Sequence, residues 1–115
     1  MATQGYRAVA KNIPISAQKV RLVVDLVRGK DVQEAMDMLD FVTKRGAEPV
    51  SKLLRSAMIN AEENHAVSRN DLMISEIFAD EARTRKWRRF GARGRFKPWL
   101  RRSSHITVVL REKGN

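Results

Sequence analysis

The chain has 115 residues, 43% of them hydrophobic, which suits one domain with a modest core. It contains no cysteine, so disulfide frameworks and cysteine-ligated metal sites are excluded. The formal net charge is +10, which favours a polyanionic partner. No window approaches the roughly 18 apolar residues of a membrane span, and the start lacks the apolar run of a signal peptide. We therefore expect a soluble, cytoplasmic protein with no membrane partner.

A strand and a helix are predicted first. From Tyr6 to Lys11, Tyr6, Ala8 and Ala10 alternate with Arg7, Val9 and Lys11, which predicts a short strand with one face on a core. Ser16 is a candidate N-cap and Gly29 a candidate C-terminal stop for the helix between them. Its apolar residues recur at helical spacing: Ala17, Val20, Val23, Val24 and Val27. Valine has low helix propensity, so packing must supply most of this helix's stability.

Two further helices are predicted. Asp31, with Glu34 three residues later, has the spacing of a capping box before a short apolar stripe. Pro49 suits the first turn of a third helix that ends near Asn64. One continuous apolar face marks this third helix: Val50, Leu53, Leu54, Ala57, Met58 and Ala61. Its polar face carries Lys52, Arg55, Glu62 and Glu63, which predicts a solvated or lightly contacting surface and not a cationic RNA ridge.

Two β-type runs flank the most basic part of the chain. Residues 72–82 place Leu72, Ile74 and Phe78 on one side, and residues 105–110 place Ile106, Val108 and Leu110 on one side. We expect the two runs to pair as one antiparallel hairpin. With about ten residues per arm, its distal part would project about 30 Å beyond the body.

The segment between these runs predicts the function. RTRKWRRFGARGRFKPWLRR, from Arg83 to Arg102, holds ten of the 23 basic residues, both tryptophans and no acidic residue. The rest of the chain has 13 basic residues against 13 acidic ones, so all of the net charge lies here. Aromatic faces and guanidinium planes stack on unpaired bases while cations neutralise phosphates. The mixture favours structured RNA over a solvated basic tail, because the segment is internal and rich in aromatic residues.

No arrangement in the sequence predicts catalysis. His65 has no second histidine one helical turn away, and His105 is more consistent with a structural or RNA-contacting role than with a catalytic base. Gly91 and Gly94 form neither a dinucleotide fingerprint nor a phosphate loop and are interpreted as turn residues. We expect no enzyme activity, no cofactor, no metal and no small-molecule substrate.

Four stretches together resemble the bacterial large-subunit ribosomal protein L twenty-two family. They are SAQKVRLVVDLVRGKDVQEAMDML at 16–39, SAMINAEEN at 56–64, IFADE at 77–81 and RRSSHITVVL at 101–110. The resemblance covers nearly the whole chain. It implies an α+β fold in which three helices pack on a small three-stranded antiparallel sheet with one long protruding β-hairpin. Residues 1–115 would form a single rRNA-binding domain, with a globular body at 1–81 and 103–115 and an extended basic hairpin at 82–102.

The resemblance also implies a function. The protein would be a structural constituent of the large ribosomal subunit that binds large-subunit ribosomal RNA and neighbouring ribosomal proteins and supports assembly by contacting several RNA domains. Its hairpin would line the nascent-peptide exit tunnel, with the tip Arg89, Phe90, Gly91, Ala92 and Arg93 facing the nascent peptide. The candidate rRNA-binding residues are Lys19, Arg21, Arg28, Arg83, Arg85, Lys86, Trp87, Arg88, Arg89, Arg93, Arg95, Lys97, Trp99, Arg101, Arg102 and His105.

The chain departs from the family pattern at two places. Ala82-Arg83 stands where many members have Gly-Pro, and Phe90-Gly91-Ala92 stands where the tip usually reads Pro-Arg-Ala. Contacts of the tip with drugs or stalling peptides are therefore not transferred. The alternative function is a free-standing, sequence-neutral RNA-binding or RNA-chaperone module, with the same arginines and the same steep salt dependence. A generic cationic arm would not require the helical motif at 16–39, which favours the ribosomal function.

Overall fold

The computed structural model describes the backbone of residues 5–83, 85–90 and 96–113 and the side chains of residues 5–83 and 102–113. Its elements are β1 (Tyr6–Ile13), α1 (Ala17–Val27), α2 (Val32–Leu39), α3 (Ala47–His65), the short 3-10 helix η1 (Arg69–Asp71), β2 (Leu72–Glu81), β3 (Arg85–Phe90), β4 (Phe96–Arg101) and β5 (Ser104–Glu112). The first sheet has the antiparallel order β1-β5-β2, and β3 pairs with β4 in a second sheet. The predicted α+β class, three helices and three-stranded sheet are confirmed.

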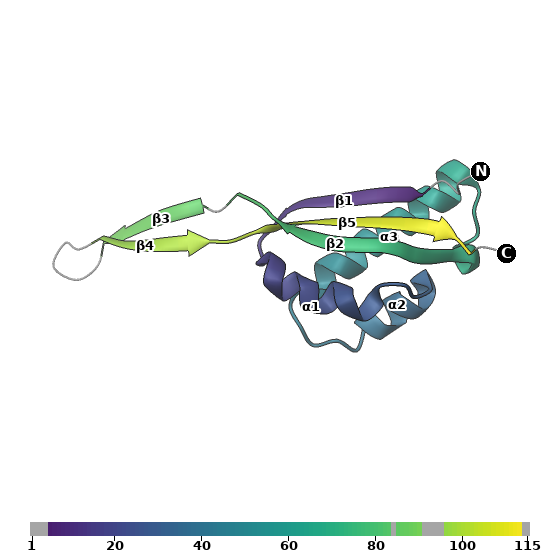
Figure 1. Cartoon of the computed structure of the whole chain (residues 1–115), viewed down its shortest axis with the longest axis horizontal. Helices are drawn as coiled ribbons and strands as arrows, with labels where there is room; N and C mark the ends of the chain where they lie inside the picture. Colours follow the sequence, from purple (N-terminus) through teal and green to yellow (C-terminus); the bar gives the residue numbers. More distant parts are fainter. Residues whose placement is uncertain (1–4, 84, 91–95, 114–115) are drawn as a thin grey trace.

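The strands β2 and β5 continue outward into β3 and β4 as one long hairpin (Figure 1). At the junction the N–H of Ala82 donates to the carbonyl of Ser103 at 3.0 Å, which carries the pairing beyond the first sheet. The molecule measures 66 × 29 × 20 Å and has a radius of gyration of 17.4 Å. A compact domain of this length has a radius of gyration of about 13 Å. The difference reflects the arm, defined here as residues 83–102.

The core lies between one face of the β1-β5-β2 sheet and the three helices. Helix α1 packs on β2, α3 packs on β1 and β5, and α2 packs on α3. The four valines of α1 that were predicted to face the core are fully buried. Burial of this apolar stripe offsets the low helix propensity of valine. The predicted apolar face of α3 is buried along its whole length.

The predicted ends of α1 and the predicted start of α2 are confirmed, but the capping box of α2 does not form. Ser16 is the N-cap of α1, where its hydroxyl accepts from the Lys19 N–H, and Gly29 follows the helix with φ +80°. Asp31 is the N-cap of α2 but makes no side-chain capping hydrogen bond. Its carboxylate instead lies 3.0 Å from Nζ of Lys113, after the end of β5. The capping box therefore does not form, because a distant lysine takes its carboxylate.

A β-bulge reverses the alternation of β2. The pairing with β5 shifts register between Ile74 and Glu76, so the residues beyond the bulge turn to the opposite face. Ile77 and Ala79 are buried, whereas Phe78 is 39% exposed on the open face of the sheet. The prediction that Phe78 shares a side with Leu72 and Ile74 is therefore wrong.

Candidate nucleic-acid interface

The backbone of the arm brings several like residues opposite one another. Trp87 pairs in register with Trp99, between the pairs Arg85–Arg101 and Arg89–Lys97. Phe90 pairs with Phe96 at the distal end of the two strands. Lys86 and Arg88 lie opposite the uncharged residues Leu100 and Pro98. Neither strand contains an acidic residue. The candidates Arg93 and Arg95 and the tip residues Gly91 and Ala92 lie outside the described residues.

The base of the arm adjoins the N-terminus of α1. A hollow of about 300 Å³ lies there, and its lining combines the start of the helix with the two chain segments that enter the arm. Arg102 lines the hollow, and Arg83, which follows the lining residue Ala82 in the chain, is exposed. The start of a helix carries partial positive charge, which adds to that of Arg102, whereas Glu81 in the same lining opposes it. The residues that line the hollow are Ser16, Ala17, Gln18, Glu81, Ala82, Arg102 and Ser103.

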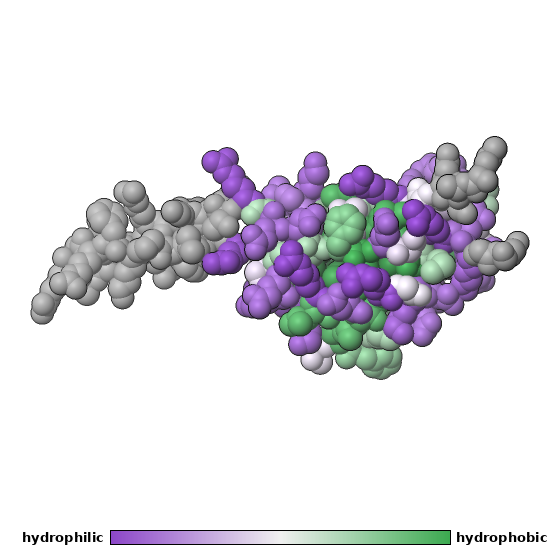
Figure 2. Space-filling view, viewed as in Figure 1, coloured by the Kyte–Doolittle hydropathy of each residue, from purple (hydrophilic) through white to green (hydrophobic). Residues whose placement is uncertain are grey.

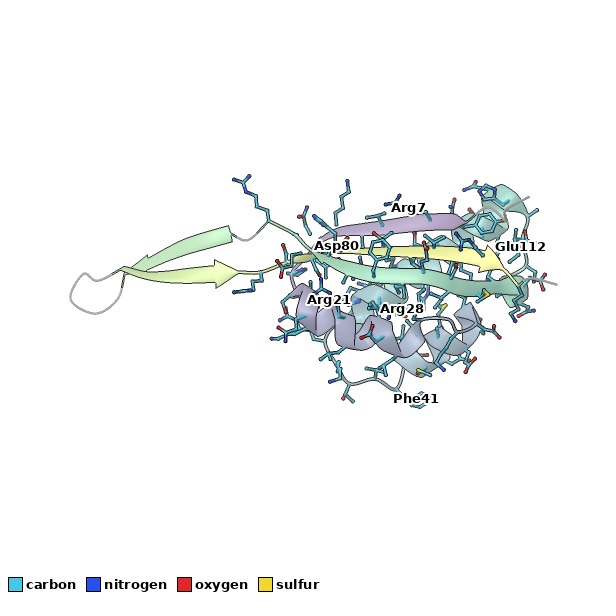
Figure 3. The ribbon with its side chains drawn as sticks, viewed as in Figure 1. Arg7, Arg21, Arg28, Phe41, Asp80 and Glu112 are labelled. Atoms are coloured by element: carbon cyan, nitrogen blue, oxygen red, sulfur yellow. The ribbon has the colours of Figure 1, made fainter. Side chains whose placement is uncertain are left out.

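Two of the candidate arginines on α1 bind the neighbouring strand. Nε of Arg21 donates to the carbonyl of Ala79 at 3.1 Å, and Nη2 of Arg28 donates to the carbonyl of Ile77 at 2.8 Å. Because β2 is an edge strand of the body sheet, its outer carbonyls would otherwise lack protein donors. Nη1 of Arg28 also lies 2.7 Å from the Asp25 carboxylate. These side chains therefore hold α1 against the sheet edge, as Figure 3 shows for Arg21 and Arg28.

The other two candidates on the body, Lys19 and His105, have polar groups with no described protein partner. Lys19 is exposed in the first turn of α1. None of the described carboxylates lies within ion-pair distance of its side chain. Nδ1 of His105 accepts a hydrogen bond from the backbone N–H of Asn12 at 3.0 Å. A neutral His105 therefore carries its proton on Nε2, which leaves a donor for a second partner.

Sequence reasoning missed one group of residues. Phe41 is 87% exposed in the loop between α2 and α3, and Lys44 and Arg45 of the same loop are also exposed. The only signal in the sequence is an aromatic residue that precedes a Lys-Arg-Gly turn. In the sequence, Phe41 continues the apolar pattern of α2 by two residues beyond Leu39, so only the structure reveals its exposure.

Within the described part of the chain, no group of three or more histidine and acidic side chains is arranged to hold a metal ion. None of the described helices combines the length and apolar character needed to cross a membrane. The sites that the structure does offer are cationic surfaces. Fold and charge together define a small α+β protein with a cationic hairpin arm, a form suited to a large polyanion.

The particular family follows from comparison with known proteins. Residues 8–111 match the family described as ribosomal protein L22p/L17e. The large ribosomal subunit protein uL22 of Dehalococcoides mccartyi strain 195 is 55% identical over 104 residues, which are 90% of this chain and 95% of the relative. The uL22 proteins of Oceanobacillus iheyensis and Pediococcus pentosaceus are 51% and 48% identical, over 93% of this chain and 95% and 91% of the relatives. The chain belongs to this family of ribosomal proteins, whose members are structural proteins and not enzymes.

Proposed function

We propose that this chain is a structural constituent of the large ribosomal subunit in the cytoplasm. It binds large-subunit ribosomal RNA and neighbouring ribosomal proteins, and it supports assembly by holding several RNA domains in fixed positions. In this proposal residues 1–115 act as one RNA-binding domain, in which the body supplies shape and the arm supplies charge. Membership of the ribosomal protein L22p/L17e family supports the proposal.

The observation that carries the proposal is the confinement of the whole net charge to the arm. The ten arm cations have no acidic neighbours in the arm sequence, and β3 and β4 place several of them in opposite pairs. A two-stranded ribbon is marginally stable alone, and like charges in register destabilise it further. Phosphate groups on both sides of the ribbon would relieve this repulsion. RNA binding therefore supplies the stabilisation that the isolated arm lacks.

The proposed RNA surface continues from the arm onto the body. Arg83 and Arg102 lie at the base of the arm, and Lys19 follows closely on the start of α1, which lines the same hollow as Arg102. Arg21 keeps its two terminal nitrogens for further partners, since only Nε bonds to Ala79 among the described groups. The body thus extends the arm's phosphate contacts.

We further propose that the arm lines the nascent-peptide exit tunnel. The arm is a narrow ribbon that extends from the body along the 66 Å long axis of the molecule, so it can enter RNA while the body stays outside. The tip residues Arg89, Phe90, Gly91, Ala92 and Arg93 would then face the peptide. Phe90 makes this tip bulkier and more aromatic than the usual family pattern.

A binding experiment tests the RNA contact. The full chain and a variant with Arg85→Gln, Arg88→Gln and Arg89→Gln are titrated against deproteinised large-subunit ribosomal RNA at several salt concentrations. We expect weaker binding by the variant and a salt slope that falls by about 0.7 to 0.9 for each lost phosphate contact. The control variant carries Lys30→Gln, Arg69→Gln and Lys113→Gln, because these cations are already paired with carboxylates. Equal slopes for the two variants would contradict the proposal.

Sedimentation separates the ribosomal function from its alternative. A free-standing RNA module would spread over all RNA when a lysate is sedimented through a gradient at high salt, whereas a subunit constituent stays with the large subunit.

A cross-linking experiment tests the tunnel proposal. The chain contains no cysteine, so Ala92→Cys introduces a single thiol. On ribosomes with a stalled peptide, a thiol cross-linker at position 92 should capture the nascent chain. The same cross-linker at Ser56→Cys on the exposed side of α3 should not.

A further inference from the structure

The neutral body carries a localised cationic hollow. A hollow of about 450 Å³ lies between the loop at 40–46 and the first half of α3. Four basic side chains, Lys44, Arg45, Lys52 and Arg55, line it together with the carboxylates Asp40 and Glu48. Glu48 pairs with Lys52 at 3.2 Å. Among the described carboxylates, none lies within ion-pair distance of the other three cations.

An exposed aromatic residue belongs to the loop that borders this hollow. Phe41 is 87% exposed, although its neighbours Asp40 and Val42 both line the hollow. The backbone at this point is fixed, because the N–H of Phe41 donates to Met38 at 3.1 Å and the N–H of Val42 donates to Leu39 at 3.1 Å. Figure 3 shows Phe41 at the outer edge of the body, and Figure 2 shows hydrophobic residues at the same edge. A fixed backbone therefore presents the ring to solvent.

The backbone that carries the cations of the loop is also held in place. Gly46 is buried against α1, where an added Cβ would come within 3.3 Å of Cγ2 of Val23. The N–H of Ala47 donates to the carbonyl of Lys44 at 3.1 Å. These contacts hold the backbone of Lys44 and Arg45 next to the start of α3.

The charge of α3 is divided along its length. Its first half presents Lys52 and Arg55 to the hollow, while its second half carries Glu62 and Glu63, with Glu62 paired to Arg69 at 2.7 Å. The sequence gives a neutral polar face for this helix, from which no RNA contact was expected. The structure places the end with Lys52 and Arg55 beside the loop and the end with Glu62 and Glu63 away from it.

We propose that Phe41, Lys44 and Arg45, together with Lys52 and Arg55, form a second RNA contact on the body, distinct from the arm. An unpaired base stacks on Phe41, and the adjoining phosphates enter the hollow. Base stacking on an exposed aromatic ring combined with phosphate neutralisation is the mode by which proteins hold single-stranded RNA. An exposed ring alone would also suit a protein partner, but the three unpaired cations favour the phosphate backbone.

This inference rests on the proposed function and adds a site to it. The loop lies on the edge of the body beyond α1 and α2, whereas the arm leaves from the end of the sheet (Figure 1). Contacts at the arm and at the loop would bind two RNA segments that lie on different sides of the body. A protein of this size could then fix two RNA segments relative to each other.

The test uses the full chain and deproteinised large-subunit ribosomal RNA as the probe. Phe41→Ser should weaken binding by at least about fivefold through the loss of stacking and leave the salt slope unchanged. Lys44→Gln combined with Arg45→Gln should lower the salt slope by about 1.4. The matched controls are Ile59→Ser, which removes another exposed apolar side chain, and Lys30→Gln with Arg69→Gln, which removes equal charge. Both controls should bind like the unmodified chain.

A second measurement places the contact in the assembled particle. Ultraviolet irradiation of intact large subunits followed by trypsin releases the peptide 31–44, in which Phe41 is the only aromatic residue. A nucleotide adduct on this peptide supports the inference. Substitution by Phe41→Ser should abolish the adduct while adducts on other peptides of the chain remain.

The outcomes distinguish this inference from the proposed function. If the loop variants bind RNA normally while the arm variant binds weakly, the second contact is wrong and the proposed function stands. If the loop variants bind RNA normally but are lost from subunits in a gradient, the patch contacts a neighbouring ribosomal protein, which also overturns the inference. If neither the arm nor the loop variants lose affinity, the proposed function itself fails.

Discussion

Arg28 donates two hydrogen bonds to the carbonyl oxygen of Ile77, from Nη2 at 2.8 Å and from Nε at 3.3 Å. The first residue lies at the end of α1 and the second lies in β2 just beyond the bulge. The guanidinium therefore covers the outer edge of β2 at the point where the strand's alternation has been reversed. A residue that the family resemblance presents as an RNA contact thus has a structural role in the isolated protein.

The first prediction concerns this contact. Arg28→Ala removes the donors from the Ile77 carbonyl and should lower the free energy of unfolding by about 1 kcal/mol, because the side chain is partly exposed and its bonds are partly replaced by water. Lys19→Ala on the same helix is the control and should have little effect, since no described group bonds to its side chain. Urea denaturation compares the midpoints. An equal effect of both changes would contradict the structural role of Arg28.

The bulge gives the second prediction. Ile77 is buried at 1% exposure and Phe78 is 39% exposed, which is the opposite of the order that alternation from Leu72 predicts. Ile77→Ala should lower the free energy of unfolding by about 2 to 4 kcal/mol through the cavity that it leaves. Phe78→Ala should cost less, although it removes more atoms. Chemical denaturation of both variants decides the order, and a larger loss at Phe78 would mean that β2 pairs without the bulge.

The third prediction compares two leucines. Leu54 on α3 is fully buried, whereas Leu22 on α1 is 54% exposed. Leu54→Ala should lower the free energy of unfolding by about 2 to 5 kcal/mol. Leu22→Ala makes the same chemical change and should stay within about 0.5 kcal/mol of the unmodified protein. Thermal unfolding followed by circular dichroism measures both. Similar losses would mean that α1 buries a different face.

The fourth prediction concerns pH. Burial raises the pKa of Tyr6 above its ordinary value of about 10, and the hydrogen bond to Glu112 and the negative charge of that carboxylate raise this pKa further. The hydroxyl donates to Oε1 of Glu112 at 3.0 Å. Since the folded pKa exceeds the unfolded one, the stability from neutral Tyr6 is fully present below about pH 10 and is lost as pH rises through the folded pKa.

Tyr6 is the only tyrosine in the chain, so phenolate absorbance reports its ionisation directly. The folded protein should show a higher midpoint than the protein in denaturant. Tyr6→Phe should remove this part of the alkaline loss of stability. A midpoint that is the same in the folded and denatured protein would show that Glu112 and burial do not act on Tyr6.

Much of the fold was predictable because local chemistry and burial agree there. The spacing of apolar residues predicts the buried face of α1, from Ala17 to Val27, and the buried face of α3. Ser16 marks the start of α1 as its N-cap. The pairing of β2 with β5 was also predictable, since two apolar runs flank a segment that cannot enter a core. The missing capping bond of Asp31 and the face of Phe78 were not predictable, because they depend on partners distant in sequence, Lys113 for the first and the β5 register for the second.

The sequence by itself determined the position of the charge and the helix faces, because composition and periodicity are properties of neighbouring residues, and its four characteristic stretches carried the family resemblance. Only the tertiary structure decided how the body's neutral charge is distributed. It brings Lys44 and Arg45 of the loop to Lys52 and Arg55 of α3 around one hollow, and it leaves Phe41 exposed beside them. It also places Arg21 and Arg28 where they donate hydrogen bonds to backbone carbonyls of β2. These outcomes depend on packing between distant segments, where a single register shift or a close approach at Gly46 sets which side chains meet.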